Sequence, residues 1–203
     1  MIMMFNLETL LESLSSKRPL FRSEKDFQES LLQIIRSKSL KCDANKIIND
    51  TKIDIWIEDG DKEMLIQLKH KTKKLSVTVD GSPFNLKNHG AKDQGRYDFL
   101  KDVKSLEPFI IDQKHRSGFS ILLTNDHRYW EKPIKPDSVD RDFQLYEGRK
   151  VSGKLQWRKE ASNGTKSGRE NAIDIKGIYE CRWKNYSQFP TQDSEFRYLC
   201  IEV

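Results

Sequence analysis

The sequence has few cysteines, and their arrangement does not indicate a site. Three occur in 203 residues, the number is odd, and no two have the spacing of a zinc-binding or redox-active pair. We therefore expect a reducing compartment, such as the cytoplasm, and thiols without a chemical role. These residues are Cys42, Cys181 and Cys200.

Long apolar runs are also missing. No stretch approaches the ~20 apolar residues that a membrane-spanning helix needs. The opening stretch, Met1 to Arg18, has no basic leader, and Glu8 and Glu12 interrupt its apolar residues, which argues against a secretory signal. We therefore expect a cytoplasmic chain with no membrane partner.

Histidines and glycine-rich stretches do not indicate a site either. The four histidines are scattered, and none pairs with another at metal-binding spacing. The stretch "SNGTKSG", which begins at Ser162, lacks the lysine and the spacing of a phosphate-binding loop. We expect no nucleotide site there, and we expect the polar segment 159–171 to be a mobile loop.

The sequence is rich in charge of both signs. Charged residues make up 33% of the chain against 36% hydrophobic residues, and the net charge is +5. A mild positive excess favours an anionic partner, of which nucleic acid is the commonest. The length fits one domain over residues 1–203, with a core at about 20–130 and a β-rich extension at about 140–203.

Apolar periodicity predicts three helices. The first follows Asn6 as N-cap, with Leu7, Leu10, Leu11 and Leu14 at helical spacing. The second begins at Ser23, which opens a Ser-x-x-Asp start pattern, and the third covers 92–107 and ends at or just before Pro108. The polar, glycine-containing segment 80–95 reads as a loop.

Strand patterns predict the sheet. The stretch "TKIDIWIEDGDKEMLIQLKHKTK", from Thr51 to Lys73, reads as two strands around a tight turn, and the near-continuous apolar run 118–124 is typical of a central strand covered on both faces. Three later segments, 142–158, 171–183 and 195–203, are β-rich. We therefore expect an α/β fold with a mixed central β-sheet flanked by helices and additional C-terminal β-strands.

The two neighbouring strands place three polar side chains on one face. Alternation sends Ile53, Ile55 and Ile57 one way and Asp54 the other, with Gln67 and Lys69 on a common face of the second strand. A Gly60-Asp61 loop pairs residue 54 with residue 67, whereas an Asp59-Gly60 loop pairs it with residue 65. Both registers keep Asp54, Gln67 and Lys69 together.

This combination suits metal-assisted cleavage of phosphodiesters. Mg²⁺ binds a few protein oxygens together with waters and substrate phosphate. Such a metal activates a water molecule and neutralises developing charge, while a lysine orients the water or stabilises the transition state.

The residues resemble those of the PD-(D/E)xK nuclease superfamily, the restriction-endonuclease-like proteins. That pattern is an Asp on one strand followed by Asp/Glu-x-Lys on the next, and Asp54 and Gln67-Leu68-Lys69 are similar to it, with Gln where the superfamily usually has an acid. The resemblance covers about residues 20–130 and implies a restriction-endonuclease-like fold in a little-characterised branch with a Gln-x-Lys variant motif.

Superfamily members often carry a further acid on the preceding helix, and Glu24 takes that position. At 100° per residue it falls about 60° from Phe27, toward the apolar face, whereas Glu29 falls about 160° away. Gln28 lies one turn after Glu24, at the border of that face. Glu63, which shares the parity of Gln67, is an alternative acid on the second strand.

The resemblance implies a metal-dependent nuclease that hydrolyses DNA with Mg²⁺ or Mn²⁺. Asp54, Gln67, the Leu68 carbonyl and Glu24 would hold the metal, and Lys69 would polarise water or the scissile phosphate. A homodimer would suit cutting of both strands. The alternative is a catalytically inactive module of the same fold that binds nucleic acid or a protein partner. Expected nucleic-acid contacts, with Gln94 and Tyr97 weakly resembling a Gln-and-Tyr helix motif of one branch, are Gln28, Lys71, Lys73, Gln94, Arg96 and Tyr97.

Overall fold

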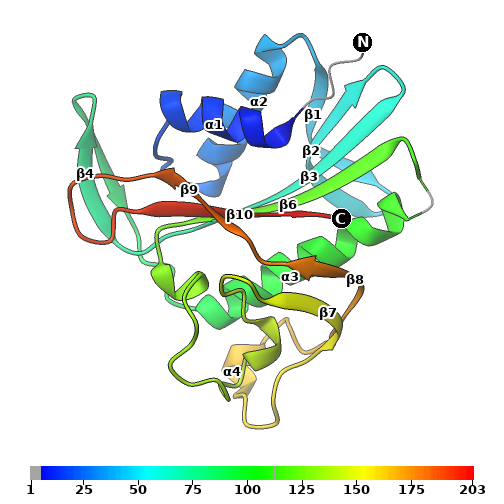
Figure 1. Cartoon of the computed structure of the whole chain (residues 1–203), viewed down its shortest axis with the longest axis vertical. Coiled ribbons are helices and arrows are strands. Elements are labelled where there is room, and N and C mark those ends of the chain that lie inside the picture. Colours follow the sequence, from blue (N-terminus) through cyan, green and yellow to red (C-terminus); the bar gives the residue numbers. More distant parts are fainter. Residues whose placement is uncertain (1–5, 112) are drawn as a thin grey trace.

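The chain builds a mixed six-stranded sheet with helices on both faces (Figure 1). The computed structural model describes residues 6–111 and 113–203, so the first five residues of the opening stretch lie outside the described part. The strand order is β1-β2-β3-β6-β10-β9, and β3 runs parallel to β6 whereas the other neighbours are antiparallel. The expected mixed α/β class is therefore confirmed. The strands are β1 (Lys41–Ile48), β2 (Thr51–Asp59), β3 (Lys62–Lys71), β6 (Arg116–Thr124), β9 (Trp183–Ser187) and β10 (Phe196–Glu202).

Helices α1 (Leu7–Lys17) and α2 (Glu24–Ser37) cover one face of this sheet. Both begin as predicted, because the Asn6 side chain accepts from the backbone N–H of Glu8 and Thr9, and the Ser23 hydroxyl accepts from that of Asp26. Their apolar faces are buried against the sheet side chains of β2, β3 and β6. This packing fixes the start of α2 over the end of β3.

The predicted hairpin forms with the Gly60-Asp61 loop. Asp59 pairs with Lys62 across a two-residue turn, and Gly60 has a φ of 63°, which glycine adopts without strain. The expected alternation fails at one position. Ile55 and Ile57 pack beneath α1 and α2, whereas Ile53 packs on the opposite face, in the cluster that includes Trp56.

Helix α3 (Lys92–Ile110) crosses the other face of the sheet and begins where predicted. The prediction that Pro108 ends it is wrong. The last turn persists because the buried Phe109 packs with Trp56, Leu65 and Leu106, and the Ile111 N–H bonds to the Glu107 carbonyl. Proline removes only one backbone hydrogen bond, and this packing outweighs that loss.

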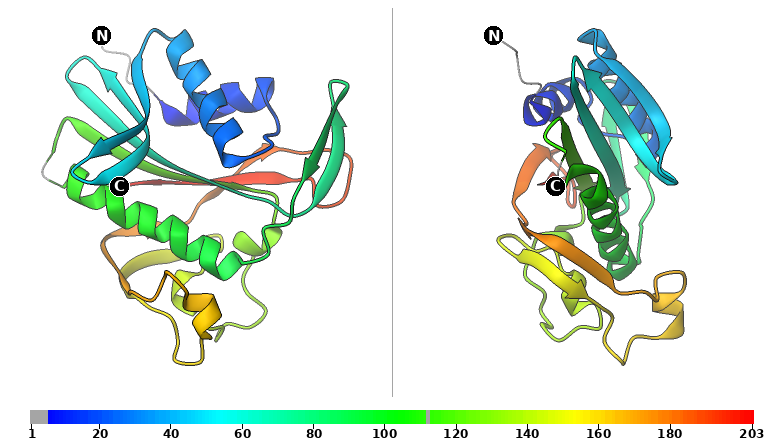
Figure 2. Two further views of the ribbon diagram at one scale, coloured as in Figure 1. Left: turned by 180° about the vertical axis from the view of Figure 1, so that it is seen from behind. Right: turned by 90° about the vertical axis from the view of Figure 1, so that its right-hand side faces the viewer.

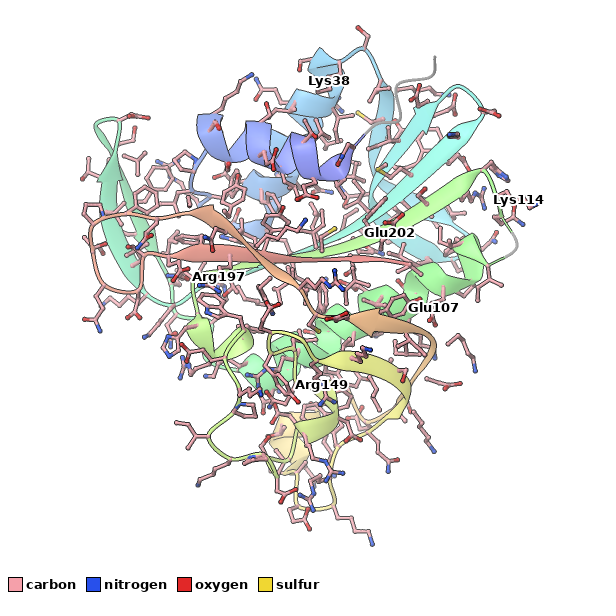
Figure 3. The ribbon with its side chains drawn as sticks, viewed as in Figure 1. Lys38, Glu107, Lys114, Arg149, Arg197 and Glu202 are labelled. Atoms are coloured by element: carbon pink, nitrogen blue, oxygen red, sulfur yellow. The ribbon has the colours of Figure 1, made fainter. Side chains whose placement is uncertain are left out.

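The C-terminal third supplies strands to two sheets. Strand β10 lies beside β6 inside the main sheet, with β9 as its outer neighbour. Strands β7 (Lys150–Leu155) and β8 (Ile173–Glu180) form a separate pair beside α3 (Figure 2). Glu107 of α3, labelled in Figure 3, connects this helix to β8, because its Oε1 accepts from the backbone N–H of Lys176 and of Gly177 at 2.8 and 2.9 Å.

Some elements differ from the expected ones. Strand β1 was not predicted, and the segment expected to be a loop from residue 80 contains β5 (Ser82–Leu86), which pairs with β4 (Leu75–Val79). The segment 159–171 contains a short helix, α4 (Asn163–Lys166), that is hydrogen-bonded to α3. Within residues 6–111 and 113–203, none of the helices has the length and apolarity needed to cross a membrane.

Candidate active site where strands β2 and β3 diverge

The site begins where the ladder between β2 and β3 stops. Backbone pairing runs from the hairpin to Ile55 and Ile66. At the next position the Gln67 side chain lies between the strands: its Oε1 accepts from the Asp54 N–H at 3.4 Å, and its Nε2 donates to the Lys52 carbonyl at 2.8 Å. A side chain therefore replaces the backbone ladder, and the two strands diverge around it.

Asp54 is held at this fork from both sides. Its Oδ2 accepts from the Leu68 N–H at 2.9 Å, and the Gln28 amide of α2 donates to the Asp54 carbonyl at 2.6 Å. On β1, Asn45 accepts from the same amide at 3.3 Å and has a φ of 55°. Departure from the ladder on both sides of Asp54 explains why Ile53 does not follow the alternation of Ile55.

Glu24 reaches the same place from the first position of α2. Its Oε2 accepts from the His70 N–H at 3.0 Å, one residue beyond Lys69. The structure thus brings the acid predicted on the helix and the acid predicted on the strand to the same end of β3. Each carboxylate uses one oxygen on a backbone N–H of β3.

Lys69 forms an ion pair with Asp102 of α3, and both side chains are more than four-fifths buried. Burial lowers the pKa of Lys69, but the carboxylates of Asp102, Glu24 and Asp54 outweigh it and raise that pKa above its usual value. Burial raises the pKa of Asp102 to about 6; Lys69 opposes the rise, and Asp54 and Glu24 add to it. The carboxylates of Asp102, Glu24 and Asp54 therefore all act on the Lys69 ammonium group. The Oδ1 of Asp54 also lies 3.9 Å from the exposed Lys52 ammonium group.

Asp102 is a site residue that the sequence analysis does not identify. Its signal is the one that singles out Glu24. At 100° per residue Asp102 falls about 60° from Phe99, about 40° from Leu106 and about 20° from Phe109. All three of these apolar side chains are buried. An acid in the middle of an apolar stripe is costly unless it has a partner.

The alternative acid, Glu63, lies elsewhere. It is four residues from Gln67 along β3, which is about 13 Å in a strand. Its carboxylate is bonded to the Trp56 indole N–H at 3.0 Å and paired with Arg116. Burial raises the pKa of Glu63, but the bonds to Arg116 and Trp56 outweigh it and lower that pKa below its usual value.

Two of the expected nucleic-acid contacts face the molecule's interior. Arg96 is buried, pairs with Asp140 at 2.6 Å and donates to the Arg128 carbonyl. Tyr97 is buried against Trp157 and donates to the Asn171 carbonyl at 2.9 Å. These side chains have structural partners, and we assign them no contact with a ligand.

The other expected contacts are divided. Gln94 donates to the backbone carbonyls of Gly164 and Thr165, and Lys73 pairs with Asp193 at 2.7 Å. Gln28 lies in the site, but its side-chain amide donates to the backbone carbonyl of Asp54. Lys71, at the end of β3, is half-buried, and its charge lowers the pKa of His89 after the effect of burial.

The site contains carboxylate and carbonyl oxygens, the ligand types that a hard divalent cation such as Mg²⁺ prefers. Glu24 and Asp54 each have a second carboxylate oxygen. The Leu68 carbonyl lies on β3 between the Leu68 N–H, which donates to Asp54, and the His70 N–H, which donates to Glu24, and it already accepts from Lys69 at 3.3 Å. Mg²⁺ is usually bound by one or two carboxylates with waters and substrate phosphate. In the described part of the chain, no three His, Cys, Asp or Glu side chains form a ready cluster for a metal. Gln67 has both ends of its amide on β2 backbone, so we assign it no ligand role.

Comparisons of the chain with protein-family models, with curated proteins and with solved structures find no match.

Proposed function

We propose that this chain is a metal-dependent nuclease of PD-(D/E)xK type that hydrolyses phosphodiester bonds of DNA. The observation that carries the proposal is the meeting of Glu24, Asp54 and Lys69 at the fork between β2 and β3, where three carboxylates surround one lysine. The excess of negative charge favours a divalent cation, and Lys69 supplies the positive charge that a phosphate needs. The mixed sheet with helices on both faces supports the restriction-endonuclease-like fold that goes with this chemistry.

Each residue has a role in this proposal. Asp54, Glu24 and the Leu68 carbonyl would hold Mg²⁺ or Mn²⁺, which supplies an activated water and neutralises charge on the phosphate. Lys69 would stabilise the charge that develops on the phosphoryl oxygens. Gln67 and Gln28 position Asp54 through backbone hydrogen bonds, and Asp102 holds the Lys69 ammonium group.

The test compares two lysines of the same strand. Plasmid and linear DNA are incubated with Mg²⁺ or Mn²⁺ and with the parent, Lys69→Ala or Lys62→Ala; Lys62 is exposed near the hairpin turn. The proposal expects metal-dependent cutting that falls on the order of 100-fold or more in Lys69→Ala and persists in Lys62→Ala. Cutting that survives in Lys69→Ala would contradict the proposal.

A second candidate is a catalytically inactive module of the same fold that binds nucleic acid or a protein partner. The observation that favours it is the neutral amide of Gln67, which is fully used between the strands. Under this candidate the parent does not cut DNA with any divalent metal. Gain of cutting in Gln67→Glu would then mark a degenerate enzyme site.

A further inference from the structure

A cleft runs along α3 next to the candidate site. Its volume is about 490 Å³, within the range of ligand sites. One side is the start of β2 at Thr51, the floor is the flank of α3 from Tyr97 to Phe109, and the other side is the segment Gly168 to Ile173. Ser105, which lines the cleft, donates to the carbonyl of Asp102 at 2.7 Å. The cleft therefore adjoins the turn of α3 that carries Asp102, the ion-pair partner of Lys69.

The far wall of the cleft is fastened to α3 by side chains of its first two turns. Arg169 makes a two-pronged ion pair with Asp98 at 2.7 and 2.8 Å, and Tyr97 donates to the Asn171 carbonyl. The Trp157 indole N–H adds a bond to the Arg169 carbonyl at 2.7 Å. Tyr97, a residue that the sequence suggested as a nucleic-acid contact, fastens this wall to α3 through its bond to Asn171.

The lining is basic on one side and apolar on another. Lys101 and Lys104 are both exposed, and none of the residues that line the cleft is acidic. The exposed Pro108 supplies apolar surface, and the buried side chains of Phe109 and Ile173 also line the cleft. Positive charge that follows a backbone, next to apolar surface for bases, is the chemistry that binds single-stranded nucleic acid.

We propose that this cleft binds one strand of nucleic acid, with phosphates on Lys101 and Lys104 and a base against Pro108. The inference deepens the proposed function, on which it rests, because the cleft would lead a strand toward Lys69. It also gives the C-terminal third a role: the segment between β7 and β8 forms one wall of the substrate site.

The experiment measures binding separately from cutting. Fluorescence anisotropy with a labelled single-stranded oligothymidylate, in EDTA, compares the parent with Lys101→Ala/Lys104→Ala and with Lys38→Ala/Lys114→Ala. The control lysines do not line the cleft; Figure 3 shows Lys38 beside the end of α2 and Lys114 at the right-hand edge of the view, beyond the end of α3. All four positions are exposed, and thermal unfolding followed by circular dichroism verifies that each variant is folded.

The expected result is binding on the order of tenfold weaker in the cleft variant at ~0.1 M salt, with a salt slope reduced by about two, and less than about twofold change in the control. Equal weakening in both variants would overturn the inference, because it would mean a general basic surface. Absence of binding by the parent would also overturn it. Selective loss in the cleft variant with a parent that cuts no DNA in Mg²⁺ or Mn²⁺ would sustain the cleft and reject the nuclease.

Discussion

Gln67 acts as a connection between strands rather than as a substitute carboxylate. Its Nε2 donates to the Lys52 carbonyl, a bond that a glutamate at neutral pH lacks the proton to make. The residue is 5% exposed, so the lost bond leaves two acceptors facing each other inside the protein. The amide is therefore suited to this fork in the absence of metal.

We predict that Gln67→Glu lowers the free energy of unfolding by about 1–3 kcal/mol in metal-free buffer at pH 7. Urea denaturation measures it, with Gln33→Glu on the exposed face of α2 as the matched control, expected within about 0.5 kcal/mol of the parent. Equal stability of Gln67→Glu and the parent would show that the amide does not hold the strands.

His70 gives a second residue-scale prediction. It is 4% exposed, packs edge-on against Phe21, and its Nε2 has no hydrogen-bond partner in the described structure. Burial lowers the pKa of His70 from 6.5 to about 4, with smaller effects from His89 and Lys71. The unfolded chain therefore binds a proton between these pH values that the folded chain does not, and stability falls as pH drops from about 6.5 to 4.

We expect His70→Phe to remove this loss. Between pH 7 and pH 4 the difference in unfolding free energy between variant and parent should shift by about 3 kcal/mol in favour of the variant. Urea unfolding at a series of pH values measures it. Parallel pH profiles for the two proteins would mean that His70 is not kept neutral by burial.

At the scale of elements, α3 is held close to the segment after β6. A Cβ added at Gly95 would collide with the hydroxyl of Tyr129, whose ring is 1% exposed. Glycine to alanine inside a helix usually stabilises by up to about 1 kcal/mol. At position 95 the collision outweighs this gain, so the substitution should destabilise the protein.

We predict that Gly95→Ala lowers the free energy of unfolding by about 1–3 kcal/mol and that Gly95→Ala/Tyr129→Phe recovers most of it. The Tyr129 hydroxyl has no partner in the described structure, so Tyr129→Phe alone should be nearly neutral. Denaturation of the four proteins forms a double-mutant cycle. Additive effects would contradict the close approach.

Element-scale patterns could be predicted where burial is strong. The helix starts at Asn6 and Ser23, the Gly60-Asp61 hairpin and the doubly covered strand β6 follow from caps, turns and apolar runs, and the structure confirms them. Strand β1 is at an edge and largely exposed, so its sequence carries no apolar alternation. β5 contains Pro83 and pairs with β4 alone, which hides its pattern.

The candidate site could be predicted from the sequence only in part. Asp54 and Glu24 reach one end of β3 because strand and helix periods place them there. The sequence could not show that Gln67 turns between the strands, because that depends on where the ladder stops. It also could not show which acid of α3 meets Lys69 without the placement of that helix on the sheet.

At the scale of the whole molecule, the last strand belongs to the centre. β10 lies between β6 and β9, and its pairing with β6 joins residues more than seventy positions apart. Local patterns do not specify such pairings. The main sheet is therefore completed only when the C-terminus is in place.

We predict that a fragment ending at residue 182, without β9 and β10, does not fold cooperatively. It loses the buried side chains of Phe196, Tyr198, Leu199 and Ile201, each worth about 1.5–3 kcal/mol when fully buried, against a total stability of about 5–15 kcal/mol. Near-ultraviolet circular dichroism reports whether the fragment has fixed tertiary packing, and thermal unfolding reports whether it unfolds cooperatively. A sharp unfolding transition in the fragment would contradict an essential role for β10.

The most direct test of the proposed nuclease compares two aspartates of β2. Asp54 lies at the fork, and Asp59 lies at the hairpin turn on the same strand. The measurement is the initial rate of DNA cleavage in Mg²⁺ by the parent, Asp54→Asn and Asp59→Asn. The proposal predicts a loss on the order of 100-fold or more for Asp54→Asn and an unchanged rate for Asp59→Asn. Equal rates for all three proteins would contradict a metal-dependent active site at the fork.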